Sequence, residues 1–203
     1  MNSKEVLIIF VKNPREGEVK TRLAKSVGDQ KALRIYTKLL EYTRDIVRPV
    51  AVDLQVWYSS YIPLKDLWDN TGAEKRTQQG ENLGDRMKHA FKTVFAEGYN
   101  RAVIIGSDCA QLDSSIIQQA FENLESFHTV IGPSTDGGYY LLGMDSMYGE
   151  LFEDMTWSTG HVFEDTIQTI KNKNLSCQRL QSLNDVDTID DWKQVKSQFP
   201  NIN

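Results

Sequence analysis

The chain has 203 residues, of which 40% are hydrophobic and 25% are charged, and its formal net charge is −5. This composition is typical of a folded globular protein, and the length suits one domain, which we expect to span residues 1–203. The acidic balance argues against a nucleic-acid binder, because nucleic-acid binding needs a basic face. Any site for an anion must therefore be local.

The sequence predicts neither a membrane span nor a secretory signal. Its apolar runs are far shorter than the roughly 20 residues needed to cross a bilayer. The first residues, MNSKEV, lack a basic segment followed by a long apolar stretch. We therefore expect a cytoplasmic protein whose two cysteines, Cys109 and Cys177, are reduced.

Strand-like and helix-like segments alternate along most of the chain. The apolar run EVLIIFV at 5–11 is typical of a strand buried on both faces, and Asp29 is a candidate N-cap for the first long helix. The later elements are predicted, in chain order, as a strand at 52–59, a short helix at 63–68, a strand at 74–79, a helix from Leu83 to Gly98, a strand at 102–108, a helix at 114–125, strands at 129–133 and 138–144, a helix at 160–172, an edge strand at 176–180 and a last helix at 188–198. This order predicts an α/β sandwich around a mainly parallel sheet.

A basic loop, NPREGEVKTRL at 13–23, follows the first strand. A phosphate-binding P-loop needs two glycines around its backbone cradle, and this loop has only Gly17. We instead expect Lys12, Lys20 and Arg22 to contact a diphosphate with their side chains. The alternative is a solvated loop whose basic residues pair with its own glutamates.

Two later segments of the sequence contain acidic residues that would suit a metal ion. Asp108 ends the strand before SDCAQL, and ligands of such sheets bind outside the carboxyl ends of strands. A carboxylate there suits Mg²⁺ or Mn²⁺, although Asp108 could instead cap the turn. In NDVDTIDDW, Asp185 and Asp187 precede the last helix, and Asp187 is our second candidate metal ligand. Asp187 or Thr188 is alternatively the N-cap of that helix.

Three further segments are candidates for substrate contact. Asp136 precedes Gly137 in STDGG, which either lets a ligand approach the backbone or forms a simple reverse turn. Gln79 and Gly80 precede a helix whose free N–H groups would receive a phosphate or a base carbonyl. In MTWSTG, either Ser158 or Thr159 caps the following helix, or the segment Trp157–Thr159 contacts the substrate.

Taken in order, these segments resemble a known bacterial family. The segments FVKNPREGEVKTRLA, QQGENLGDRM, GSDCAQL, GPSTDGGYYLLG, WSTG and DVDTIDDW resemble glycosyltransferase-like proteins labelled transferase 1 or domain of unknown function 2064. That family belongs to the nucleotide-diphospho-sugar transferase superfamily, which has the GT-A fold. The resemblance runs through nearly the whole chain, and it implies a three-layer α/β/α sandwich with a mainly parallel, mixed central sheet.

The resemblance also implies a site. Its basic-loop pattern falls on residues that would contact nucleotide phosphates, namely Lys12, Pro14, Gly17, Val19, Lys20, Thr21, Arg22 and Leu23. The metal-binding acid of similar enzymes falls on Asp108. Two departures stand out: Ala110 replaces a common proline, and Asp108 is a single acid where many glycosyltransferases of this fold have D-x-D.

Three functions fit these residues. The first is a metal-dependent glycosyltransferase that uses a nucleotide-sugar donor, a small-molecule acceptor and Mg²⁺ or Mn²⁺, with Asp108 and Asp136 as catalytic residues. The second is a nucleotidyltransferase, which the single acid favours, and the third is a nucleotide-binding module without activity. The nucleotide and substrate contacts are expected from Lys12, Lys20, Thr21, Arg22, Gln79, Gly80, Gly137, Trp157, Ser158 and Thr159, and the metal contacts from Asp108 and Asp187. The oligomeric state is left open.

Overall fold

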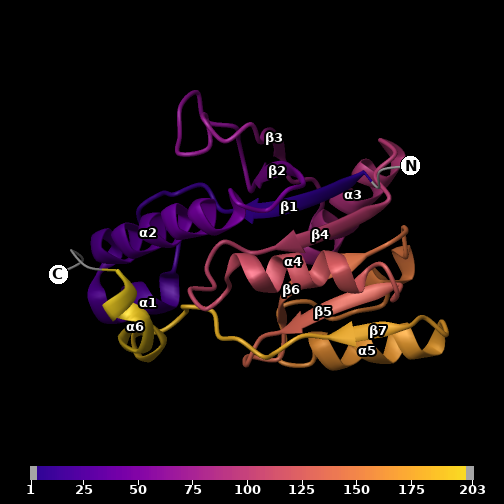
Figure 1. The fold of residues 1–203 in the computed structure, drawn as a ribbon. Coiled ribbons are helices and arrows are strands. Elements are labelled where there is room, and N and C mark those ends of the chain that lie inside the picture. The colour runs from indigo at the N-terminus through magenta and orange to yellow at the C-terminus, as the bar shows by residue number, and fades with distance from the viewer. Residues whose placement is uncertain (1–3, 200–203) are drawn as a thin grey trace.

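A seven-stranded sheet forms the middle layer of the computed structural model, which describes residues 4–199 (Figure 1). The strands are β1 (Glu5–Val11), β2 (Asp53–Tyr58), β3 (Glu74–Thr77), β4 (Arg101–Ile105), β5 (Thr129–Pro133), β6 (Tyr139–Met144) and β7 (Cys177–Arg179). They lie in the order β3-β2-β1-β4-β6-β5-β7. Only β6 runs antiparallel to its neighbours, β4 and β5. The prediction of a mainly parallel, mixed sheet with an edge strand near 176–180 is confirmed.

Helices cover both faces of this sheet, as the sandwich prediction requires. The helices of residues 4–199 are α1 (Thr21–Val27), α2 (Asp29–Val47), α3 (Leu83–Ala96), α4 (Ser114–Asn123), α5 (Val162–Asn172) and α6 (Ile189–Val195), with short 3₁₀ turns η1 (Gly149–Phe152) and η2 (Lys196–Gln198). Of these, α2 and α4 pack on one face of the sheet and α3 and α5 on the other. No helix within residues 4–199 combines the length and the apolar character that crossing a membrane requires.

The central strand β1 shows why the three layers hold together. Leu7 and Ile9 pack in one apolar cluster with residues of α2 and α4. Val6 and Ile8 alternate with them and pack in a second cluster with residues of α3 and α5. All four are fully buried, and burying each such side chain contributes about 1.5–3 kcal/mol. The continuous apolar run therefore encodes a strand between two helical layers.

The strand pairing brings several loops to one edge of the sheet. Ile9 of β1 lies opposite both Val56 of β2 and Ile105 of β4, so these parallel strands end at nearly the same level. The antiparallel strand β6 begins at that edge, with Leu141 opposite Ile105. The loops after β1, β2 and β4 and the loop before β6 consequently lie together.

A third apolar cluster places the end of the chain beside α1. Leu23 of α1, Ile35 of α2 and Trp192 of α6 share this cluster and are at most 4% exposed. Figure 1 shows α6 next to α1, beyond the sheet edge. The packing fixes the segment that leads into α6, where Asp185 and Asp187 lie.

Four predicted details of the helices were wrong. Residues 63–68 form turns rather than a short helix, because the Asp66 side chain accepts a bond from the Trp68 N–H at 2.9 Å and closes a local turn. The helix α1 was predicted as part of the basic loop. Gly28, and not Asp29, is the N-cap of α2. His161 is the N-cap of α5, without a side-chain bond, so neither Ser158 nor Thr159 caps that helix.

Side-chain caps begin two other helices. Asp113 caps α4 by accepting a bond from the Ile116 N–H at 3.0 Å. Thr188 caps α6 in a capping box with Asp191. Because Thr188 performs this role, Asp187 is not needed as the cap.

Candidate active site at the carboxyl ends of the strands

A cavity of about 740 Å³ opens at the sheet edge where β1, β2, β3 and β4 end and β6 begins. The residues predicted to form a site that line it are Lys12, Lys20, Thr21, Arg22, Asp108, Asp136, Trp157, Ser158, Thr159 and Asp187. A cavity at the carboxyl ends of parallel strands is the position where ligands bind in open α/β sheets. The fold thus brings together residues that lie up to 175 positions apart, from Lys12 to Asp187.

Lys20 occupies the centre of the acidic part of this cavity. Its Nζ lies 2.7 Å from Asp108 Oδ2 and 2.9 Å from Asp187 Oδ1, and its side chain is 4% exposed. Burial lowers the pKa of Lys20, but the two carboxylates more than offset this effect and raise it overall. Lys20 is therefore an ammonium group between two carboxylates.

The other predicted basic residues are arranged differently. Arg22 is 73% exposed and lies 3.9 Å from Asp187, which is a weak surface pair. The ammonium of Lys12 has no carboxylate within 4.0 Å among residues 4–199. Lys12 therefore has no ion-pair partner in that range to give up when a ligand binds.

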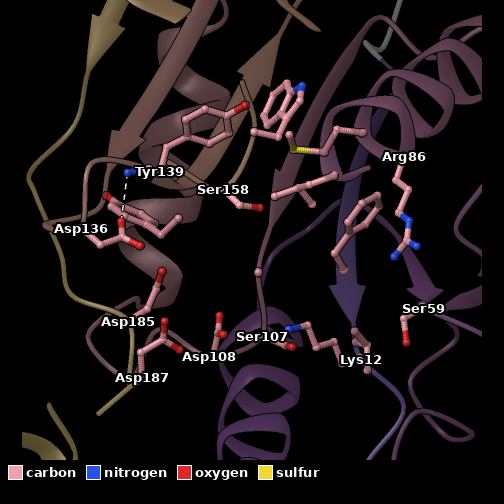
Figure 2. Close-up of a pocket in the computed structure, with 18 of the residues that line it drawn as sticks. Lys12, Ser59, Arg86, Ser107, Asp108, Asp136, Tyr139, Ser158, Asp185 and Asp187 are labelled. Atoms are coloured by element: carbon pink, nitrogen blue, oxygen red, sulfur yellow. Dashed lines mark hydrogen bonds between the residues drawn. The ribbon is translucent and has the colours of Figure 1, made fainter. Parts of the chain in front are cut away.

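Four aspartates gather on one side of the cavity, as Figure 2 shows. Burial raises the pKa of Asp185 to about 8, and the charges of Asp108, Asp136 and Asp187 add to the rise against the opposing effect of Lys20. Burial also raises the pKa of Asp108, but Lys20 more than reverses this and leaves it below its usual value. At neutral pH Asp108 is therefore a carboxylate, whereas Asp185 is largely protonated.

Asp136 lies at the start of the turn that leads into β6. Its Oδ1 accepts a bond from the Gly138 N–H at 2.9 Å, which agrees with the reverse-turn interpretation of this segment. Its Oδ2 has no hydrogen bond within residues 4–199, and the residue lines the cavity. Asp136 therefore supports the turn and still presents a carboxylate oxygen.

A buried tyrosine links the loops after β1 and β4. The Tyr36 hydroxyl accepts a bond from the Lys12 N–H at 3.0 Å and lies 3.1 Å from both the Lys12 carbonyl and the Ser107 Oγ. Burial raises the pKa of Tyr36 to about 12. This neutral hydroxyl joins the Lys12 backbone to Ser107, the residue before Asp108.

Three predicted contacts do not line the cavity: Gln79, Gly80 and Gly137. A Cβ on Gly137 would lie 2.0 Å from the Gly160 carbonyl oxygen, so this glycine allows two loops to pack. The Gly80 carbonyl accepts a bond from Arg86 Nε at 3.1 Å. Gln79 is exposed, and its neighbour Gln78 lines the cavity instead. These positions shape the site without facing it.

The sequence prediction also missed residues that line the cavity. Ser59 and Gln78 are the first residues after β2 and β3. Ligands of such sheets bind at the carboxyl ends of the strands, so examining the residue after every strand would have found both. Arg86 lies one turn into α3 and carries no local signal. Figure 2 shows Arg86 across the cavity from the aspartates, whereas the Lys12 side chain extends toward Ser107. Arg86 has no carboxylate within 4.0 Å in residues 4–199.

The acidic group suits a divalent cation. Within residues 4–199 no three His, Cys, Asp or Glu side chains are arranged as a ready metal cluster. Asp108 and Asp187 nevertheless contact one cation already, the ammonium of Lys20, and Asp136 and Asp185 line the same cavity. Mg²⁺ commonly takes one or two carboxylates and completes its coordination with water and phosphate. The donor set fits such an ion.

The sheet order, the layers and the position of the cavity define a protein with the nucleotide-diphospho-sugar transferase fold. A crystal structure of a provisionally assigned nucleotide-diphospho-sugar transferase from Desulfovibrio desulfuricans G20 has a TM-score of 0.89 to this structure. It is 32% identical, and the match covers 98% of this chain and 89% of that one. The family model for uncharacterized proteins conserved in bacteria, DUF2064, matches residues 43–159. The chain belongs to this family.

More distant structures share the fold alone. The 4-diphosphocytidyl-2C-methyl-D-erythritol synthase from Anaerococcus prevotii DSM 20548 is 11% identical, with a TM-score of 0.67 and coverage of 97% of this chain and 98% of that one. The Rv0371c protein from Mycobacterium tuberculosis H37Rv, in complex with manganese, is 13% identical, with a TM-score of 0.57 and coverage of 95% and 98%. The comparison with curated proteins gives no match.

Proposed function

We propose that this protein is a metal-dependent glycosyltransferase that uses a nucleotide-sugar donor and a small-molecule acceptor. The observation that carries the proposal is the convergence of Lys20, Asp108 and Asp187 at the carboxyl ends of the strands. The relative from Desulfovibrio desulfuricans G20, at 32% identity over nearly the whole chain, supports the nucleotide-sugar donor.

The acidic and the basic residues of the cavity are both assigned to the diphosphate of such a donor. Asp108 and Asp187 would hold Mg²⁺ or Mn²⁺, which when bound neutralises negative charge on a departing diphosphate. Lys12, Lys20 and Arg22 would contact the diphosphate oxygens. At about 4 Å and an effective dielectric near 20, each unit-charge pair contributes roughly 4 kcal/mol before desolvation. The cations would therefore favour departure of the nucleoside diphosphate.

The remaining lining residues are assigned to the sugar and the acceptor. Asp136 presents a free carboxylate oxygen to the cavity, and we assign it the role of accepting a proton from the attacking hydroxyl. Thr21, Ser158 and Thr159 offer hydroxyl groups, and Trp157 offers a flat apolar surface for a sugar ring. Together these roles describe transfer of a sugar from a diphosphate to an acceptor hydroxyl.

The experiment is a panel of nucleotide-sugars and sugar or alcohol acceptors with Mg²⁺ or Mn²⁺, read by release of nucleoside diphosphate. We expect Asp108→Asn to reduce turnover by about 100-fold or more, because it removes a ligand of the charge-stabilising ion. The matched control is Asp190→Asn, because Asp190 is 77% exposed, pairs with Lys193 and lies outside the cavity. Equal activity of the Asp108 variant and the wild-type protein would contradict the assignment.

Nucleotidyl transfer is the second candidate, and two observations favour it. The first is that Asp108, just after β4, is a single acid in Ser107-Asp108-Cys109 and not part of a D-x-D pair. The second is that the 4-diphosphocytidyl-2C-methyl-D-erythritol synthase from Anaerococcus prevotii shares the fold. In this reaction a phosphorylated acceptor attacks the α-phosphate of a nucleoside triphosphate, and pyrophosphate leaves. Release of pyrophosphate from a triphosphate, without release of diphosphate from nucleotide-sugars, would select this candidate. Nucleotide binding without either product would instead indicate a binding module.

A further inference from the structure

The ammonium of Lys20 occupies the place between the two carboxylates to which the proposed function assigns a metal ion. Its Nζ is within 2.9 Å of an oxygen from each of Asp108 and Asp187. Its side chain is 4% exposed, whereas those of the two aspartates are 35% and 40% exposed. The carboxylates are therefore partly open to solvent, while the ammonium between them is almost fully covered.

The backbone at Lys20 adopts an uncommon conformation. Lys20 has φ 49° and ψ 44°, a left-handed conformation that residues with a side chain rarely adopt. It is the N-cap residue of α1, yet its side chain makes no capping bond. Its carbonyl accepts the bond from the Ala24 N–H at 2.8 Å. The conformation directs the long side chain away from the helix end and toward the aspartates.

A divalent cation and this ammonium cannot both lie between the same two carboxylates. Both are positive, and at such separations their repulsion is strong because the side chain of Lys20 is buried. The four-carbon stem of lysine turns readily, so the ammonium can move toward another anion. The cavity that Lys20 lines is where the proposed function assigns the diphosphate.

We propose that Lys20 is a built-in counter-ion that holds Asp108 and Asp187 in place of the metal, and that the metal displaces it toward the diphosphate. Lys20 and the metal then compete for the carboxylates, while the metal and the diphosphate assist each other. This inference rests on the proposed function. Linkage requires the assistance to be reciprocal: a nucleoside diphosphate tightens metal binding, and the metal tightens nucleotide binding.

The test measures Mn²⁺ binding by the electron paramagnetic resonance signal of free Mn²⁺, with and without the nucleoside diphosphate CDP or UDP. Lys20→Met removes the charge and keeps a similar length. Without nucleotide, we expect it to bind Mn²⁺ about 5-fold more tightly or better than the wild-type protein. With nucleotide, the wild-type protein should gain affinity and Lys20→Met should gain less. The control is Lys25→Met, which lies on the exposed side of α1 outside the cavity and should behave as the wild type.

The outcomes separate this inference from the proposed function. Equal or weaker Mn²⁺ binding by Lys20→Met in the absence of nucleotide would overturn the competition alone. Absence of Mn²⁺ binding by both proteins, with or without nucleotide, would overturn the metal site and the inference together. Lys20→Gln, which retains a hydrogen-bond donor without the charge, provides the same measurement if Lys20→Met does not fold.

Discussion

Among single residues, Gly137 allows two loops beside the cavity to pack closely because it has no side chain. It has φ +89°, and a Cβ would lie 2.0 Å from the Gly160 carbonyl oxygen, next to Thr159 of the cavity lining. Gly98 has a similar φ of +84° but open space around it. Alanine substitutions at the two glycines therefore separate two contributions to the free energy of unfolding: the strain of a left-handed backbone and the collision of the new Cβ with a neighbour.

We predict that Gly98→Ala lowers the free energy of unfolding by about 1–2 kcal/mol, the cost of a left-handed alanine. Gly137→Ala should cost clearly more and should also weaken nucleotide binding, because the loop at 158–160 must move. Urea unfolding and calorimetric titration measure both effects. Equal losses of stability for the two variants would show that the loop yields without cost.

Tyr36 allows a second prediction at this scale. Tyr36→Phe would leave the Lys12 N–H without its partner, and we expect a loss of about 1–3 kcal/mol in the free energy of unfolding. Because Tyr36 also holds Ser107 beside Asp108, nucleotide affinity should fall by up to about tenfold.

Tyr42→Phe is the matched control. Its hydroxyl donates to the Leu112 carbonyl at 2.8 Å, outside the cavity lining. This variant should lose stability and keep nucleotide affinity. If the two variants bind nucleotide equally well, Tyr36 does not order the site.

At the scale of elements, the start of α4 gives a pH-dependent prediction. Hydrogen bonds from the Ser115 hydroxyl and from the Ile116 N–H lower the pKa of Asp113. A lowered pKa means that the stabilisation is present above the unfolded pKa near 3.9 and is lost as the pH falls through the folded value. We predict that Asp113→Ala lowers the free energy of unfolding by about 1 kcal/mol at pH 7 and by less near pH 3.

Asp113→Asn separates charge from capping, because the amide accepts the same bond and does not titrate. Urea unfolding between pH 7 and about pH 3 should show a difference from Asp113→Ala that stays constant with pH. A difference between wild type and Asp113→Ala that does not change with pH would show that the charge at the cap is unimportant.

Some helices and strands could be predicted from the sequence, and others could not. Buried strands such as β1 and β4 carry long apolar runs, and Asp113 and Thr188 are strong cap residues, so these elements were predicted well. The seven-residue helix α1 was missed because it buries only Leu23 and follows a basic loop. Residues 63–68 resemble a helix in composition, but the bonds of Asp66 favour turns. The structure of α1 and of residues 63–68 depends on tertiary contacts and local side-chain hydrogen bonds, which the pattern of apolar residues does not reveal.

At the scale of the whole molecule, the topology assembles the candidate site. Lys12, Asp108 and Asp136 all line one cavity. Their positions in the sequence, just beyond strands, indicated this, because ligands of open α/β sheets bind at the carboxyl ends of the strands. The pairing of Lys20 with Asp108 and Asp187 spans 88 and 167 positions and has no local signal. It depends on the apolar cluster that packs α6 against α1. The positions of candidate residues were therefore predictable, and their partners were not.

We propose that one cavity binds a metal ion and a nucleoside diphosphate between the carboxylates and the cations. The most direct measurement is an anomalous difference map from crystals soaked with Mn²⁺ and a nucleoside diphosphate. We predict a manganese peak in contact with Asp108 and Asp187, with the diphosphate beside it and near Lys12 and Lys20. Nucleotide bound elsewhere on the protein, or at this cavity with manganese remote from both aspartates, would contradict it.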